Sequence, residues 1–195
     1  MPGPLISDLD GTIADTAPAI FHSLRVTCSE LGIPLSTKQE LSWSLGPPLH
    51  WCLERIGVGA DMMRDAIAIF ERAHTDCIDL VVPMPGADVV IPELAETGVQ
   101  IGVATIKPSG IADLVLRTIG LRDYVRVLCG RNDDLDPRTK TDLVRETLSE
   151  LPGASPVYIG DHDNDELAAR ELGIRFLRYP ESSWDVVRSA MADVP

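Results

Sequence analysis

Two acidic residues near the start of the chain are spaced for attack on a phosphate ester. Asp8 and Asp10 are separated by one residue, and Gly11 after them lets the backbone turn sharply. One carboxylate can attack phosphorus to form an acyl phosphate, while its neighbour protonates the departing oxygen and then activates water. The pair suits a nucleophile and an acid/base, although a solvated acidic turn would use the same residue types.

A second acidic cluster, Gly160 to Asp165, follows another apolar stretch and precedes a helical pattern that begins near Glu166. If both clusters meet, their carboxylates would repel a phosphate dianion by several kcal/mol per close pair, so a divalent cation is needed. Oxygen ligands favour Mg²⁺. We predict Asp8 and Asp161 as direct ligands. Asp165 would hold a metal-bound water, anchor neighbouring groups, or cap the helix.

A threonine and a lysine are candidates for holding a phosphoryl group. Thr105 follows the apolar run Gln100–Ala104, so its hydroxyl and the next backbone N–H, that of Ile106, would point to one edge of a sheet. Lys140 begins a helical pattern, where a cation opposes the helix dipole unless acidic groups compensate it. It is therefore preferred over Lys107, although a surface lysine without a role is the alternative.

Five short apolar runs predict the strands that position these residues. Helical patterns lie between them, and from about residue 81 strand and helix alternate. This alternation predicts an α/β fold with a doubly wound, mostly parallel, Rossmann-like sheet that binds ligands at the carboxyl ends of its strands. The runs are Pro4–Ser7, Gln100–Ala104, Tyr124–Leu128, Pro156–Ile159 and Ile174–Leu177.

Residues 16–80 interrupt the alternation. Apolar residues three or four apart predict one helix around Ile20–Leu31 and another around Met63–Cys77. We expect an inserted all-α cap at 16–80 and a core formed by residues 1–15 and 81–195. The hinges would lie near Asp15 and near residues 80–83. Pro92, inside the next helical pattern, predicts a late start or a kink there.

The composition excludes several classes of protein. There are 30 acidic and 17 basic residues, for a net charge of -13, without a basic run, so a nucleic-acid polymer is not an expected partner. The chain has no apolar stretch of membrane-spanning length and no export signal at its start, so we expect a cytoplasmic protein that does not associate with a membrane. Its four cysteines lack metal-ligand spacing, which favours buried thiols. The oligomeric state stays open.

Together, the four motifs resemble the haloacid dehalogenase-like hydrolase superfamily over nearly the whole chain. The first motif of that family, D-x-D-G-T, corresponds to Asp8–Thr12, and its G-D-x-x-x-D motif corresponds to Gly160–Asp165. Thr105 matches the threonine of the second motif, and Lys140 the lysine of the third. The position of the helical insert is similar to that in the phosphoglycolate phosphatase branch.

The resemblance implies a phosphatase that acts on a small-molecule phosphate ester through an aspartyl phosphate with Mg²⁺. Asp8 would be nucleophile and metal ligand, and Asp10 would be the acid/base with its backbone carbonyl on the metal. Asp161 would complete the protein ligands, with Asp165 as a further candidate. The phosphate-binding set would be Gly11, Thr105, Ile106 and Lys140.

Because of two departures from the family pattern, the substrate of a relative cannot be assigned to this chain. Ile106 stands where relatives usually have Asn, and Arg138-Thr139-Lys140 replaces a Lys-Pro pair. The ester could be phosphoglycolate, a nucleotide or a sugar phosphate. A phosphomutase of the same superfamily is the main alternative, and a receiver-like module or a degenerate phosphate-binding protein is a weaker one.

The insert would select the leaving group, because a helical cap closes over the site and excludes water. Trp43 and Trp51 are more typical of a cap core. The other polar and loop candidates are His22, Arg25, Arg55, Arg72, His74 and Gly46-Pro47-Pro48.

Overall fold

A five-stranded parallel sheet forms the centre of the core in the computed structural model, which describes residues 3–35, 40–133 and 136–192. The strand order is β5-β4-β1-β6-β7, and each neighbouring pair is parallel. The order reverses beside β1, which places a topological switch point there. The strands are β1 (Leu5–Ser7), β4 (Ile101–Pro108), β5 (Val127–Arg131), β6 (Val157–Gly160) and β7 (Arg175–Arg178).

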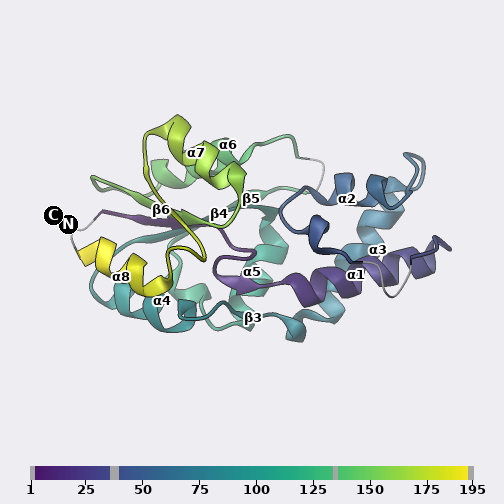
Figure 1. Cartoon of the computed structure of the whole chain (residues 1–195), viewed down its shortest axis with the longest axis horizontal. Coiled ribbons are helices and arrows are strands. Elements are labelled where there is room, and N and C mark those ends of the chain that lie inside the picture. Colours follow the sequence, from purple (N-terminus) through teal and green to yellow (C-terminus); the bar gives the residue numbers. More distant parts are fainter. Residues whose placement is uncertain (1–2, 36–39, 134–135, 193–195) are drawn as a thin grey trace.

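Helices cover both faces of this sheet, which confirms the predicted doubly wound α/β fold (Figure 1). One face carries α4 (Ala87–Glu96), α5 (Ser109–Thr118) and α8 (Trp184–Ala192), whose apolar side chains share a core with β1 and β4. The other face carries α6 (Lys140–Ser149) and α7 (Asp163–Leu172), which pack on Ile6, Ala104 and Tyr158. Each buried strand therefore contributes side chains to two apolar layers.

Two local expectations were wrong, and one of the two alternatives for Pro92 is excluded. The strand predicted at Tyr124–Leu128 starts at Val127, because Arg122–Tyr124 form a 3₁₀ turn and the Arg122 guanidinium donates to the Val125 carbonyl. Helix α7 begins at Asp163 rather than near Glu166, since a capping box at His162 and Asp165 starts it earlier. Helix α4 begins at Ala87 and continues past Pro92, so it does not start late.

Three helices lie between the first strand and the rest of the core, at one end of the molecule (Figure 1). They have an apolar cluster of their own, centred on Leu24, Leu53 and Phe70. The chain enters this region through β2 (Ala14–Asp15) and leaves it through β3 (Val82–Pro83), and these two short strands pair antiparallel. The helices are α1 (Ala17–Glu30), α2 (Leu49–Arg55) and α3 (Met63–Asp76), of which α2 was not predicted.

The four cysteines, Cys28, Cys52, Cys77 and Cys129, are buried as predicted. Across the described ranges, every helix is too short or too polar to pass through a bilayer.

Close packing between β4 and α6 sets the position of Lys140, the first residue of that helix. A Cβ atom on Gly102 would lie 2.4 Å from Cγ2 of Thr147 and 2.6 Å from Cδ1 of Leu151. Helix α6 can therefore approach the sheet this closely only because position 102 has no side chain.

We predict that Gly102→Ala lowers the free energy of unfolding by about 1–3 kcal/mol, because the helix must move away from the strand. The matched control is Gly110→Ala in α5, where an added Cβ meets no atom within 4 Å. That change should raise the free energy of unfolding by roughly 0.5–1 kcal/mol through helix propensity. Urea unfolding measures both, and equal effects would contradict the close approach.

Candidate active site

The two acidic motifs meet because they follow neighbouring strands. Ser7 of β1 is in register with Ile159 of β6, and the Asp8 backbone N–H donates to the Ile159 carbonyl at 2.9 Å. Both strands therefore end at the same edge, with Asp8 and Asp161 just beyond it. One carboxylate oxygen from each of Asp8, Asp161 and Asp165 lies within 4.8 Å of the others.

Lys140 lies among these carboxylates. Its ammonium contacts Oδ1 of Asp8 at 2.6 Å and Oδ1 of Asp165 at 3.1 Å, and it donates to the Ala104 carbonyl at 3.1 Å. The side chain is buried. Lys140 is therefore not a surface lysine, and the acidic compensation that its helix-terminal position requires is present.

The carboxylate of Asp165 is fully enclosed and already hydrogen-bonded on both oxygens. The Tyr158 hydroxyl donates to Oδ1 at 2.5 Å, and the His162 backbone N–H donates to Oδ2 at 3.0 Å. Lys140 also contacts Oδ1. These contacts fit the anchoring alternative for Asp165 and orient Lys140 toward Asp8.

The Asp10 side chain points away from the three-carboxylate cluster. The Thr16 hydroxyl donates to its Oδ1 at 2.7 Å, and the Lys107 ammonium lies 3.3 Å from its Oδ2. Lys107 is buried in this ion pair and is not the solvated lysine that its sequence position also allowed. Two donors thus hold a carboxylate beside the nucleophile candidate without placing it in the cluster.

Gly11 and Thr12 fix the position of the Asp161 carboxylate. Gly11 has φ +76°, and a Cβ there would lie 2.4 Å from Oδ2 of Asp161. The Thr12 hydroxyl donates to the other oxygen of Asp161 at 3.1 Å. The glycine is needed both for the left-handed backbone conformation and for the close approach of Asp161.

Burial and crowding disfavour negative charge in this cluster. Burial raises the pKa of Asp8 to about 8 against the opposing effect of Lys140, and the carboxylates of Asp165 and Asp161 add to the rise. Burial and Asp165 also raise the pKa of Asp161. Burial alone would lower the pKa of Lys140, but Asp8 and Asp165 raise it above its usual value. One ammonium therefore does not balance the acids, and their hard oxygen atoms suit a divalent cation such as Mg²⁺.

Thr105 and Ile106 lie inside β4, which continues to Pro108 instead of ending at Ala104 as predicted, and its register with β5 shifts between Ala104 and Pro108. The Thr105 hydroxyl accepts a hydrogen bond from the Lys107 backbone N–H at 3.2 Å, and Thr105 is buried. Together with Gly11 and Lys140, both residues line the cavity over the acidic cluster. The predicted phosphate-binding set is thus gathered in one place.

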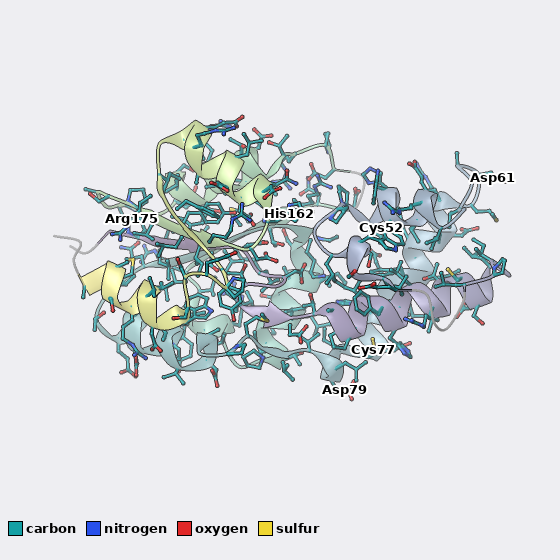
Figure 2. The ribbon with its side chains drawn as sticks, in the orientation of Figure 1. Cys52, Asp61, Cys77, Asp79, His162 and Arg175 are labelled. Carbon is teal, nitrogen blue, oxygen red and sulfur yellow. The ribbon has the colours of Figure 1, made fainter. Side chains whose placement is uncertain are left out.

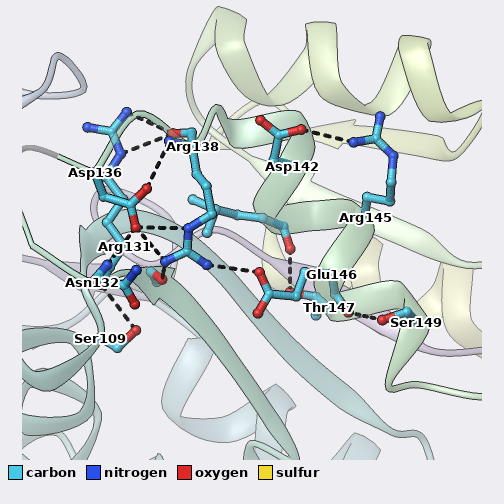
Figure 3. A network of polar contacts seen from close by, with 12 residues as sticks. Ser109, Arg131, Asn132, Asp136, Arg138, Asp142, Arg145, Glu146, Thr147 and Ser149 are labelled. Carbon is cyan, nitrogen blue, oxygen red and sulfur yellow. Dashed lines mark hydrogen bonds and ion pairs between the residues drawn. The ribbon is translucent and has the colours of Figure 1, made fainter.

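A polar network holds the segment that precedes Lys140 (Figure 3). The Arg138 guanidinium donates to Asp136 at 2.7 and 2.9 Å and to Glu146 at 2.9 Å. Arg131 donates to the Arg138 carbonyl at 3.0 and 3.1 Å. The unusual Arg-Thr-Lys sequence thus places an arginine where it connects the end of β5 to α6 and fixes the start of that helix.

A cavity of about 360 Å³ separates the acidic edge from the helical insert. Its walls come from both sides, and the loop at Gly46 comes so close to His162 that an added Cβ would lie 2.6 Å from the imidazole. Figure 2 shows His162 in the middle of the molecule, between Arg175 in the core and Asp61 at the far end of the insert. The insert therefore covers the acidic edge.

Of the cap candidates, His74 and the Gly46-Pro47-Pro48 loop line this cavity. The others do not. Arg72 pairs with Glu30 at 2.6 Å on the surface, and the Arg55 guanidinium lies over Trp43 and Trp51 at 4.6 and 5.2 Å from the ring centroids. His22 and Arg25 line a different hollow.

The sequence analysis did not identify three residues of this site. Thr16 donates a hydrogen bond to Asp10, Tyr158 donates one to Asp165, and Glu71 lines the cavity. Helical spacing could have indicated Glu71, because it lies one turn before His74 on α3. Thr16 and Tyr158 carry no comparable signal, since their contacts depend on tertiary packing.

Fold and side chains define a parallel α/β protein with an acidic site at its switch point. The sequence model of the haloacid dehalogenase-like hydrolase family matches residues 5–179, so the chain belongs to that family. Phosphoglycolate phosphatase from Cereibacter sphaeroides is 30% identical over 190 residues, which cover 93% of this chain and 86% of that protein. The predicted family and branch are confirmed.

Other similar proteins carry different names. Tyrosine-protein kinase PtkA from Mycobacterium tuberculosis is 28% identical over 182 residues, 89% of this chain, which spans only 60% of PtkA. Its solved structure aligns with a TM-score of 0.77 over 91% of this chain and 83% of that chain, at 28% identity. CbbY from Rhodobacter sphaeroides, in complex with phosphate, shares the fold with a TM-score of 0.77 at 19% identity, over 92% and 87% of the two chains.

We predict that Mg²⁺ binds more tightly as pH rises. The raised pKa of Asp8 means that the metal-free folded protein carries an extra proton between about pH 4 and pH 8, which the metal must displace. Titration calorimetry should show affinity at least about tenfold higher near pH 9 than near pH 6, with proton release only at the lower pH. Equal affinity for Mg²⁺ at pH 6 and pH 9 would contradict the raised pKa of Asp8. Metal-free protein should also lose stability as pH rises through this window.

Proposed function

We propose that the chain is a Mg²⁺-dependent phosphatase that hydrolyses a small-molecule phosphate monoester through an aspartyl phosphate. The contact between Lys140 and Asp8 carries this proposal, because it holds a carboxylate at the floor of a cavity next to a cation that can also bind a phosphoryl oxygen. Family membership supports the same chemistry.

In the first step, an oxygen of Asp8 attacks phosphorus and the P–O bond to the alcohol breaks. Asp10 gives its proton to the departing alcohol oxygen. Asp10 then takes a proton from a water molecule, which attacks the acyl phosphate and releases inorganic phosphate and free Asp8. Thr16 and Lys107 hold the Asp10 carboxylate on the cavity side for both proton transfers.

The metal would be held by Asp8, Asp161 and the backbone carbonyl of Asp10, with Asp165 anchoring Lys140 and the start of α7. Bound there, Mg²⁺ supplies positive charge that offsets the phosphate and the crowded acids. Lys140, Thr105 and the backbone N–H groups of Gly11 and Ile106 would bind the transferring phosphoryl oxygens.

Residues 16–80 would act as a cap on a core of residues 1–15 and 81–195. Their own apolar cluster and the paired strands β2 and β3 support this division, because both connections lie side by side and can flex together. The close contact of the Gly46 loop with His162 would mark the closed position. Closure excludes water while the alcohol leaves.

A phosphomutase is the alternative within the same family. Release of inorganic phosphate from a simple ester with Mg²⁺ and without a phosphosugar acceptor would favour the phosphatase. Phosphoryl transfer only when an acceptor is present would favour the mutase.

We predict that Asp8→Asn lowers phosphate release from a small phosphate ester by at least about a thousandfold, because the amide is a poor nucleophile. The matched control is Asp163→Asn in the second acidic motif, whose side chain is 92% exposed. It should retain near-normal activity. Release by Asp8→Asn at the normal rate would remove the proposed nucleophile, and circular dichroism checks that both variants are folded.

A second expectation concerns the metal. Excess chelator should stop phosphate release, and added Mg²⁺ should restore it, because the acids would otherwise repel the substrate. Full activity in chelator would contradict a metal-dependent mechanism.

A further inference from the structure

Part of the cavity lining is apolar, and we term this part the chamber. Side chains from α1, α2, α3, α5 and the loop before α2 surround it. At about 360 Å³, the whole cavity falls in the range of small-molecule pockets, roughly 300–1,000 Å³. The apolar residues that define the chamber are Ile20, Leu24, Leu45, Leu49, Phe70 and Ile111.

The chamber offers no free positive charge among the described residues that line the cavity. The two lysines there are already paired: Lys140 with Asp8 and Asp165, and Lys107 with Asp10. No arginine is part of that lining. An anionic group on the substrate, other than the phosphate itself, would therefore meet no arginine and no lysine without a neighbouring acid among the described residues of the lining.

Negative charge at the chamber makes a second anion still less favourable. Glu71 lines the cavity from α3, and burial together with nearby Asp133 raises the pKa of the Glu71 carboxyl. Asp15 lines it from the other side and accepts a hydrogen bond from the Ala17 backbone N–H at 3.2 Å. A buried carboxylate without a cation costs several kcal/mol, and two acids on the wall increase that cost.

His74 supplies the main unsatisfied polar group. It lines the cavity, has no exposed surface, and stacks on Phe70 with 5.8 Å between ring centroids. The Ala19 carbonyl is nearby, but neither ring nitrogen makes a hydrogen bond of good geometry with any described atom. Because the ring has no exposed surface, its nitrogens offer no partner to a charged group in the cavity.

We propose that the leaving group of the substrate is an uncharged, largely apolar alcohol or phenol. This inference rests on the proposed phosphatase function and adds the chemical class of its substrate. It predicts that phosphoglycolate is a poor substrate, because its leaving group carries a carboxylate and every lysine in the described cavity lining is already beside an acid.

The chemistry balances with the residues already placed. The P–O bond of the ester breaks as Asp8 bonds to phosphorus, and the alcohol oxygen takes its proton from Asp10. The apolar remainder of the alcohol stays in contact with the chamber, whose burial of apolar surface contributes roughly 25 cal/mol per Å². Specificity then comes from the penalty that a charged leaving group meets there.

The test compares three esters of closely similar alcohols on the wild-type protein with Mg²⁺: benzyl phosphate, 4-carboxybenzyl phosphate and 4-(aminomethyl)benzyl phosphate. Phosphoglycolate is the fourth ester. We expect kcat/KM for benzyl phosphate to exceed that for the carboxylated ester and phosphoglycolate by at least about 100-fold. We expect it to exceed that for the amine by at least about tenfold, because the chamber is mainly apolar.

Glu71→Gln provides the matched variant. It should raise the ratio of kcat/KM for the carboxylated ester to that for benzyl phosphate by roughly tenfold, since one repelling charge is removed. The control is Glu150→Gln at the exposed end of α6, which should change neither value.

The outcomes separate the two proposals. Either charged benzyl ester, or phosphoglycolate, hydrolysed as fast as benzyl phosphate would overturn the inference and leave the phosphatase in place. No phosphate release from any of the four esters would overturn the phosphatase and the inference with it. Preference for benzyl phosphate, together with a rise in the relative kcat/KM of the carboxylated ester in Glu71→Gln, supports both.

Discussion

The ammonium group of Lys140 lies among carboxylates that could not otherwise be buried together. It reaches Asp8 at 2.6 Å and Asp165 at 3.1 Å, and it also donates to the Ala104 carbonyl in β4. Two strands, β1 and β4, and two helices, α6 and α7, therefore meet at a single side chain. Such a buried cluster contributes little net stability, because desolvation offsets the attraction, but loss of one partner leaves an uncompensated charge. The surrounding structure serves this arrangement: Gly102 lets α6 approach, and the Arg138 network fixes its first turn.

The cluster also explains why the site needs an additional cation and a lid. Burial raises the pKa of Asp8, so the cluster is poorly matched to its single lysine until a metal adds charge. The insert deepens that burial, because the Gly46 loop approaches His162 across the cavity. Its inner wall is apolar where the leaving group would lie, and both lysines of the cavity are turned toward the acids. The same lack of unpaired positive charge would favour a substrate whose leaving group is uncharged.

Sequence alone could predict the parts of the site that lie just after a strand or in its carboxyl-terminal half. Asp8, Thr105 and Asp161 were placed correctly at one edge, because parallel strands expose their carboxyl ends together. Lys140 could be predicted from the start of its helix, since its charge there requires acidic neighbours. The fold class followed from the alternation of apolar runs and helical patterns. Contacts that depend on packing could not be predicted, such as those of Thr16 with Asp10 and of Tyr158 with Asp165. Which of the eight cap candidates line the cavity is decided by how the insert packs on the core. The start of β5 was missed because a 3₁₀ turn takes up Arg122–Tyr124, where the residue types also suit a strand.

A double-mutant cycle tests most directly whether Lys140 and Asp8 form the centre of this structure. The free energy of unfolding would be measured in urea, without Mg²⁺, for the wild type, Lys140→Met, Asp8→Asn and the double variant. We expect a coupling energy of at least about 2 kcal/mol, because each single change leaves a buried group without its partner. Additive effects within roughly 0.5 kcal/mol would contradict the account.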